Sequence, residues 1–317
     1  MANLGFKIKM EYINLGQTDL KISRLGLGTW AIGGFGWGKI NDIDSIAAIR
    51  KAWDLGISFF DTADVYGLGH AEEILAKALG RSCKKAIIAT KFGVRVGNDG
   101  KTYKDISPQY AVEALEASLR RLKIDCIPLY QIHWPDGVTN IYDTMNALKK
   151  CQEQGKIKHI GYSNFPIGLI AEAEGAARGE SLQVPYNLIA RDIEKEIIPF
   201  CQERNITLIT YGPLAQGLLS GKISKEFKFG SNDIRARDPN WQGEAFKRNL
   251  VRVEFLKKIG EQHGKTAAQT AIRWVLDKNI NGAVLAGATC MEHVVENVEA
   301  MDWHLSSDDM DGLQKFK

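Results

Sequence analysis

The 317-residue chain lacks the features that mark several classes of protein. No apolar run approaches the roughly 18 residues that a membrane-spanning helix needs, and residues 1–10 hold no apolar stretch typical of a signal peptide. Basic and acidic residues nearly cancel, with a formal net charge of +3 and no long run of either sign. We therefore expect neither a nucleic-acid nor a membrane partner.

Cysteine is also scarce. The chain has five cysteines, scattered, odd in number and never in a C-x-x-C pair: Cys83, Cys126, Cys151, Cys201 and Cys290. A chain of this length can bury enough apolar surface to fold without disulfides or a structural metal. We therefore expect reduced cysteines in a cytoplasmic protein. The sequence also lacks H-E-x-x-H, G-x-S-x-G and clustered histidines, so it predicts no metal site and no hydrolase centre.

What the chain does contain is a long alternation of short apolar runs and helical patterns. The runs begin at Leu25, Ile57, Ala86, Ile127, Ile157, Leu182, Ile206 and Ala283. Such runs fit parallel strands buried on both faces, and nearly all are followed by apolar residues at helical spacing. The pattern predicts an α/β fold, a (β/α)₈ TIM barrel formed as one domain by residues 1–317. Residues 11–15 and 20–24 flank a turn and predict an N-terminal β-hairpin at the barrel floor.

Residues 26–31 match G-x-G-x-x-A and point to an alternative, a dinucleotide-binding fold of the Rossmann type. That motif works only when a helix begins within it, because the helix amides then face the pyrophosphate. The next residues, 32–38, include four glycines, which disfavours a helix. We favour a loop at the barrel mouth, with Gly28, Thr29 and Trp30 near the reactive end of a ligand.

Four polar residues follow apolar runs at what would be the same end of the barrel: Asp61, Tyr66, Lys91 and His133. Each has an ordinary explanation by itself, as a helix cap, a loop aromatic, a solvated charge or a core histidine. Barrel enzymes, however, place their chemistry at the carboxyl ends of the strands. The four side chains are therefore predicted to meet in one active site.

These residue types suit the reduction of a carbonyl, which needs a hydride and an acid that protonates the new alkoxide. A tyrosine has a pKa of about 10 in water, and a nearby cation lowers it. We expect Lys91, held by Asp61, to make Tyr66 an acid near neutral pH, with His133 orienting the substrate oxygen or sharing the proton relay. The hydride must come from a cofactor, because no side chain can supply it.

The same residues lie in segments that resemble the aldo-keto reductases. Residues 59–67, Phe-Phe-Asp-Thr-Ala-Asp-Val-Tyr-Gly, resemble the F-x-D-T-A-x-x-Y-G signature of that family. Residues 90–91 and 131–136 resemble its lysine and histidine segments, and residues 155–165 its G-K-I-R-x-I-G-V-S-N-F stretch. The likeness covers nearly the whole chain and is similar in type to bacterial members and to potassium-channel β subunits.

The resemblance implies a barrel that binds NADP(H) across its carboxyl-terminal rim, with Tyr66 as the general acid of a catalytic tetrad. It also implies that Ser163, Asn164 and Gln183 hold the nicotinamide carboxamide and that Tyr211 stacks on the ring. The full set of expected cofactor contacts is Gly28, Thr29, Trp30, Asp61, Ser163, Asn164, Gln183, Tyr211, Gly212, Leu214, Gly217, Lys222, Gly287, Thr289, His293 and Asn297. The expected substrate contacts are Trp30, Trp37, Tyr66, His133 and Trp134.

The match weakens at the adenosine end, where relatives usually carry an arginine or lysine for the 2′-phosphate. Thr289 and His293 stand there instead, and neither has a permanent charge, although Lys222, Arg235 or Arg237 could compensate. We expect NADPH as the cofactor and leave NADH open. The substrate is expected to be a small carbonyl compound. The alternative function is a cofactor-binding regulatory subunit with little turnover, and the sequence predicts no oligomeric state.

Overall fold

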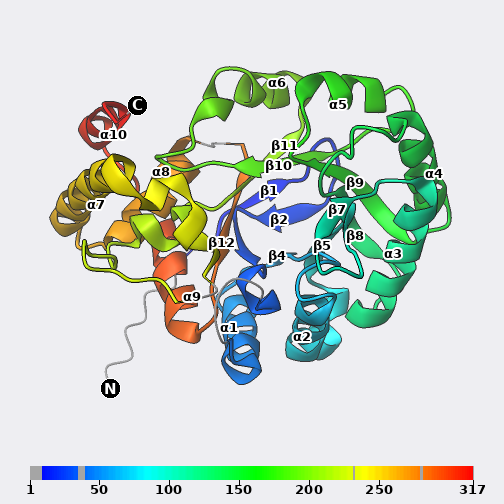
Figure 1. Cartoon of the computed structure of the whole chain (residues 1–317), viewed down its shortest axis with the longest axis horizontal. Helices are drawn as coiled ribbons and strands as arrows, with labels where there is room; N and C mark the ends of the chain where they lie inside the picture. The colour runs from blue at the N-terminus through cyan, green and yellow to red at the C-terminus, as the bar shows by residue number, and fades with distance from the viewer. Residues whose placement is uncertain (1–8, 35–39, 231–232, 279–280, 317) are drawn as a thin grey trace.

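Eight parallel strands close into a barrel that helices surround in chain order (Figure 1). The computed structural model describes residues 9–34, 40–230, 233–278 and 281–316. The barrel strands are β3 (Leu25–Gly28), β4 (Phe59–Asp61), β5 (Ile87–Phe92), β8 (Ile127–Ile132), β9 (Ile157–Ser163), β10 (Ser181–Pro185), β11 (Thr207–Tyr211) and β12 (Ala283–Gly287). The last strand, β12, pairs in parallel with the first, β3, and so closes the ring. Every predicted strand is present, and the predicted TIM barrel is confirmed.

Most of the α-helices cover the outside of the barrel, whereas α7 and α10 lie at the edge of the molecule beyond α8 (Figure 1). The α-helices are α1 (Asp42–Asp54), α2 (His70–Leu79), α3 (Pro108–Leu122), α4 (Ile141–Glu153), α5 (Ile167–Ala173), α6 (Ile197–Arg204), α7 (Gly243–His263), α8 (Ala267–Lys278), α9 (Met291–Val298) and α10 (Ser307–Gln314). Helix α3 begins with a cap and a proline: the Ser107 side chain accepts a hydrogen bond from the Tyr110 amide, and Pro108 takes the first turn. None of the helices in the described ranges is long and apolar enough to cross a membrane.

The barrel floor is filled by the predicted N-terminal hairpin. Its strands, β1 (Tyr12–Asn14) and β2 (Lys21–Ser23), pair antiparallel. Leu15 and Ile22 are fully buried in a cluster with Phe59 and other side chains of the barrel interior. Burial of one such side chain stabilises a fold by about 1.5–3 kcal/mol. The hairpin therefore closes the end of the barrel opposite the strand ends that carry the site.

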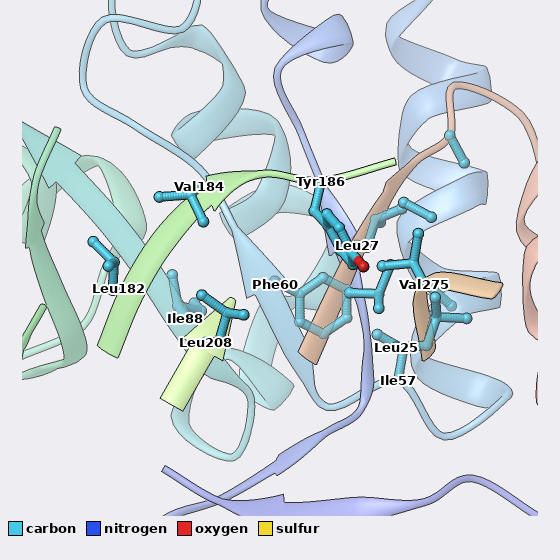
Figure 2. Packing of buried hydrophobic residues seen from close by; sticks show 14 of the residues in the cluster. Leu25, Leu27, Ile57, Phe60, Ile88, Leu182, Val184, Tyr186, Leu208 and Val275 are labelled. Carbon is cyan, nitrogen blue, oxygen red and sulfur yellow. The ribbon is translucent and has the colours of Figure 1, made fainter. Parts of the chain in front are cut away.

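Neighbouring residues of one strand enter two different cores, which explains why the apolar runs show no alternation. Phe59 lies in the cluster inside the barrel, whereas Phe60 lies in the larger cluster between the strands and the helices. Figure 2 shows this outer cluster, in which Phe60 lies near Leu27 of β3 and Val275 of α8. Both faces of the sheet are buried, so both faces need apolar residues.

The loops at the barrel mouth contain structure that the sequence did not predict. After β5, the chain forms a second antiparallel hairpin from β6 (Val94–Val96) and β7 (Thr102–Lys104). Short 3₁₀ turns occupy other connections: η1 (Ala31–Gly33), η2 (Gly80–Lys84), η3 (Asp192–Glu194), η4 (Ala215–Ser220), η5 (Ile234–Arg237), η6 (Pro239–Trp241) and η7 (Glu299–Met301). Only the three-residue η1 follows the G-x-G-x-x-A match before α1 begins at Asp42. The alternative dinucleotide fold is therefore excluded.

Candidate active site

A buried ion pair joins the carboxyl ends of β4 and β5. The Lys91 Nζ donates to Asp61 Oδ1 at 2.6 Å and to the carbonyl oxygen of Thr62 at 2.8 Å. The Lys91 side chain is fully buried and that of Asp61 is 5% exposed. A buried charge needs its partner, because an unpaired one loses hydration without compensation. The pair is thus fixed in position by the barrel itself.

The second oxygen of Asp61 is held by two amides from other strands of the barrel, Gln183 on β10 across the barrel and Gln131 on β8 next to β5. Gln183 Nε2 donates to Asp61 Oδ2 at 2.7 Å, and Gln131 Nε2 approaches the same oxygen at 3.3 Å. The sequence had predicted Gln183 as a cofactor contact, and the structure shows its amide group serving Asp61. Gln131 was not predicted at all, although it lies beside His133 in a matched segment. Both glutamines help to hold the carboxylate in the orientation in which its other oxygen meets Lys91.

Tyr66 and His133 complete the predicted cluster. The Lys91 Nζ lies 5.2 Å from the centroid of the Tyr66 ring. The rings of Tyr66 and His133 meet edge to face, with centroids 5.8 Å apart and planes at 79°. His133 is 9% exposed, and its Nδ1 is buried with no hydrogen-bond partner in the described ranges. The structure therefore brings together all four side chains that the sequence placed in one site.

The turn that carries Tyr66 is held by a close approach of two backbone segments. The Tyr66 amide donates to the carbonyl oxygen of Ala63 at 3.1 Å. Gly33 packs directly against this turn, and a Cβ added to it would lie 2.8 Å from the Gly67 amide nitrogen. Glycine is needed at position 33 because no side chain fits there. One glycine of the loop after β3 thus helps to position Tyr66.

Burial sets the ionisation of both ring side chains. Burial and the charge of Lys91 hold the pKa of His133 well below its usual value, so the imidazole is neutral at neutral pH. Burial also raises the pKa of Tyr66 well above its usual value, and the carboxylates of Asp61 and Asp64 raise it further. The expectation that the neighbours of Tyr66 make it unusually acidic is therefore wrong for this arrangement of protein groups. The two acids and burial outweigh the single ammonium.

Three predicted cofactor contacts form one hydrogen-bonded group next to the tetrad. Asn164, which has a left-handed backbone with φ of 58°, donates from Nδ2 to the carbonyl oxygen of His133 at 3.2 Å and to Ser163 Oγ at 3.0 Å. The Tyr211 hydroxyl donates to Asn164 Oδ1 at 3.0 Å. These side chains lie at the ends of β9 and β11 and are tied directly to the tetrad.

The rim between β3 and β12 offers open space for a ligand. Gly28 and Gly287 are paired across these strands. A Cβ added to Gly28 would have its nearest neighbour 3.9 Å away, and the same holds for Gly287. The next residue, Thr29, donates from its amide and its hydroxyl to the Asp61 carbonyl oxygen at 2.9 and 3.0 Å. An open backbone surface therefore begins beside the tetrad, as binding of an extended cofactor requires. Trp30 is 39% exposed at this edge.

The predicted pyrophosphate loop meets α9 through an ion pair. The Lys222 Nζ donates to Glu296 Oε2 at 2.9 Å, and Thr266 donates to Glu296 Oε1 at 3.0 Å. The Lys222 side chain is 58% exposed. Asn297, the next residue of α9, donates from Nδ2 to the Gly287 carbonyl oxygen at 3.3 Å. The predicted pyrophosphate loop and the predicted adenosine segment thus lie together, and Lys222 is paired with a carboxylate.

The remaining predicted cofactor residues lie in two segments, residues 212–217 and residues 289–293. Gly212 and Gly217 have left-handed backbones with φ of 67° and 94°. Leu214 packs against the outer core. His293 is exposed on α9 and Thr289 is half-buried before that helix.

Two arginines of the long connection differ in their placement. Arg235 pairs with Asp233 at 2.7 Å and donates to the Gln216 carbonyl oxygen at 3.3 Å, so it holds the loop itself. Arg237 is exposed. Arg235, which the sequence suggested as a possible phosphate partner, therefore stabilises its own loop.

The predicted substrate contacts are only partly accounted for. Trp134 is 36% exposed, directly after His133, and the Lys104 Nζ lies 4.9 Å from the centroid of its ring. Trp37 lies outside the described residues. Within the described residues there is no group of three or more histidine, cysteine, aspartate or glutamate side chains arranged to hold a metal ion.

Comparison with known proteins agrees with this geometry. The description "Aldo/keto reductase family" matches residues 24–317. The aldo-keto reductase YhdN of Bacillus subtilis (strain 168) is 39% identical over 303 residues, which cover 95% of this chain and 91% of the relative. The NADH-specific methylglyoxal reductase of Escherichia coli (strain K12) is 34% identical, covering 95% of this chain and 96% of that protein. The solved glycerol dehydrogenase of Gluconobacter oxydans has a TM-score of 0.90 at 36% identity, covering 96% and 94% of the two chains. This chain therefore belongs to the aldo/keto reductase family.

Proposed function

We propose that this protein reduces an aldehyde or ketone to an alcohol and that Tyr66 supplies the proton. The observation that carries the proposal is the buried Lys91–Asp61 pair, whose ammonium lies 5.2 Å from the centroid of the Tyr66 ring. A nicotinamide cofactor supplies the hydride, which no side chain can provide. The carbonyl carbon takes a hydride from the reduced cofactor, and the carbonyl oxygen takes a proton from Tyr66. The products are one alcohol and the oxidised cofactor.

The ionisation of the protein groups supports these roles. The raised pKa of Tyr66 keeps its hydroxyl protonated at neutral pH, so a proton is available for the substrate oxygen. The phenolate that forms is stabilised by the Lys91 ammonium. His133 is neutral, and its imidazole can form a hydrogen bond with the same oxygen. Asp61 holds the lysine side chain in place.

We propose NADPH as the preferred cofactor, with its nicotinamide end at Ser163, Asn164 and Tyr211 and its phosphates near Lys222. Support comes from the hydrogen-bonded group beside the tetrad and from the open rim at the ends of β3 and β12. NADH is the competing cofactor for two reasons. The relative from Escherichia coli is NADH-specific, and the Lys222 ammonium is already paired with Glu296.

The test is a carbonyl panel of sugars, keto acids and aromatic and aliphatic aldehydes, including 4-nitrobenzaldehyde, read by the absorbance of the reduced nicotinamide. We expect turnover, with a higher kcat/KM for NADPH than for NADH. Cofactor binding without turnover of any carbonyl would favour the regulatory-subunit alternative. A clear preference for NADH would overturn only the cofactor proposal.

A further inference from the structure

A second buried carboxyl group, that of Asp64, lies in the turn that carries Tyr66 and has no part in the reaction described so far. Asp64 is 8% exposed and stands two residues before Tyr66. Its Oδ2 accepts a hydrogen bond of 2.7 Å from the Tyr110 hydroxyl. Its Oδ1 is buried with no hydrogen-bond partner in the described part of the chain. A buried carboxylate with one oxygen unsatisfied is costly, so this site favours the neutral acid.

Asp64 is connected to the tetrad through the backbone of its turn. The Asp64 amide donates to the carbonyl oxygen of Lys91 at 3.2 Å. The Tyr66 amide closes the same turn on Ala63. The carboxyl is thus held close to Tyr66 by a short, hydrogen-bonded segment, and its charge adds to the pKa of Tyr66.

The groups around Asp64 come from every element packed against it. On α2, Glu72 is fully buried and repels a second negative charge. On α3, Arg121 pairs with Glu72 at 2.5 Å and favours the charged form of Asp64. On β8, Tyr130 is fully buried and its pKa is raised by burial and then by Asp64. Lys91 on β5 directs its ammonium to Asp61 instead.

On the side of the barrel mouth, Arg95 contacts the ring of Tyr110, which in turn is hydrogen-bonded to Asp64. The guanidinium of Arg95 on β6 lies 4.5 Å from the centroid of the Tyr110 ring. Arg95 pairs with Asp105 at 2.9 Å, so most of its charge is compensated locally. Burial is the largest influence on Asp64 and raises its pKa to about 7, while the Tyr110 hydrogen bond lowers it. Asp64 therefore changes charge within the neutral range.

We propose that Asp64 and Tyr110 form a positioning pair that sets how readily Tyr66 gives up its proton as the pH changes. This inference rests on the proposed carbonyl reduction. When Asp64 carries its proton, it adds no negative charge to that of Asp61, which already opposes the phenolate that forms on Tyr66. When Asp64 is ionised, its negative charge opposes that phenolate and slows proton transfer. No atoms are exchanged with the substrate, so the pair acts through Tyr66 alone.

The test is the pH profile of kcat for reduction of an uncharged aldehyde at saturating cofactor, for the wild type and three variants. As the pH rises through neutral, we expect kcat of the wild type to fall roughly threefold in one step. This corresponds to a change of about half a unit in the pKa of Tyr66. Asp64→Asn should lack the step and keep the higher rate above it. Tyr110→Phe should move the step to higher pH, because the hydrogen bond that favours the charged form is lost. Asp125→Asn, which changes an exposed carboxylate, should match the wild type.

Either of two results would overturn the inference. One is a step that persists in Asp64→Asn, and the other is an equal loss of rate at every pH, which a purely structural role predicts. Absence of any carbonyl reduction by the wild type would instead count against the proposed function. Should Asp64→Asn fail to fold, the direction of the shift in Tyr110→Phe decides the question.

A second measurement needs no activity. The pKa of Asp64 is about 7 in the folded chain, compared with the ordinary value of 3.8 for an aspartate. Between these two pH values the folded chain keeps the Asp64 proton and the unfolded chain has lost it. The unfolded state binds fewer protons in that window, so stability falls as the pH rises through it. Asp64→Asn should therefore gain stability relative to the wild type from acidic to neutral pH and show a constant difference above. A difference that does not change with pH would show that Asp64 does not titrate as proposed.

Discussion

The two sides of the barrel mouth are built in different ways. On the tetrad side, Asp61 and Lys91 lie in strands, form a pair that is almost fully buried, and are surrounded by amides from other strands. On the side of the proposed nucleotide site, Lys222 and Glu296 come from a loop and a helix, and the lysine is mostly exposed. Exposed pairs contribute about 0–1 kcal/mol, whereas breaking a buried pair costs several. The proposed chemistry thus lies on the barrel strands, whereas the proposed nucleotide contacts lie on a loop and a helix outside them.

Both sides of the mouth have non-glycine residues in the left-handed region. On the tetrad side these are Leu68 and Asn164, with φ of 55° and 58°. On the other side they are Ala215 and Gln216, with φ of 46° and 57°. Such residues are rare. Different contacts hold the two pairs: Asn164 is hydrogen-bonded to the carbonyl oxygen of His133, whereas Arg235 donates to the carbonyl oxygen of Gln216 within its own loop.

The largest expected effect is on the tetrad side. Tyr66→Phe removes the proposed proton donor and should lower kcat for reduction by about 10²–10⁴-fold. Cofactor affinity, measured by fluorescence titration, should stay near the wild-type value. Tyr103→Phe, on an exposed tyrosine of β7, is the matched control and should change neither quantity. A Tyr66→Phe enzyme with near-normal turnover would remove Tyr66 from the acid role.

The two ion pairs can be compared directly by the same substitution. Lys91→Met leaves Asp61 buried and unpaired, so the free energy of unfolding should drop by about 3–5 kcal/mol. Lys222→Met breaks an exposed pair and should cost at most about 1 kcal/mol. Denaturant unfolding of both variants measures the difference. Equal losses would show that the contrast between the two sides does not hold.

The smallest expected effect concerns cofactor choice. Glu296→Gln removes the carboxylate that pairs with Lys222 and makes its ammonium available to a phosphate. The ratio of kcat/KM with NADPH to that with NADH should rise by a few-fold, and less at high salt because exposed charges are screened. Glu292→Gln, on an exposed residue of the same helix, controls for net charge. An unchanged or lower ratio would mean that Lys222 does not contact the 2′-phosphate.

Much of the fold could be predicted because its signals are local. Apolar runs, helical spacing and the turn of the N-terminal hairpin belong to neighbouring residues, and the barrel and hairpin that they predicted were confirmed. The β6–β7 hairpin was not predicted, since its strands have three residues each and lie at the surface. Helix α10 was missed for a related reason. It has eight residues and begins with a capping box rather than an apolar repeat.

The candidate site, like the fold, could be predicted in part from the sequence. The sequence by itself determined which residue types stand at the strand ends, since a parallel barrel brings all those ends to one rim. Only the tertiary structure decided how they pair and ionise: Gln183 reaches Asp61 from 122 positions away, and burial raises the pKa of Tyr66 where a nearby cation alone would lower it. The physical reason is that the type of an element depends on neighbours along the chain. Burial and charge depend on distant segments that meet only when the barrel closes.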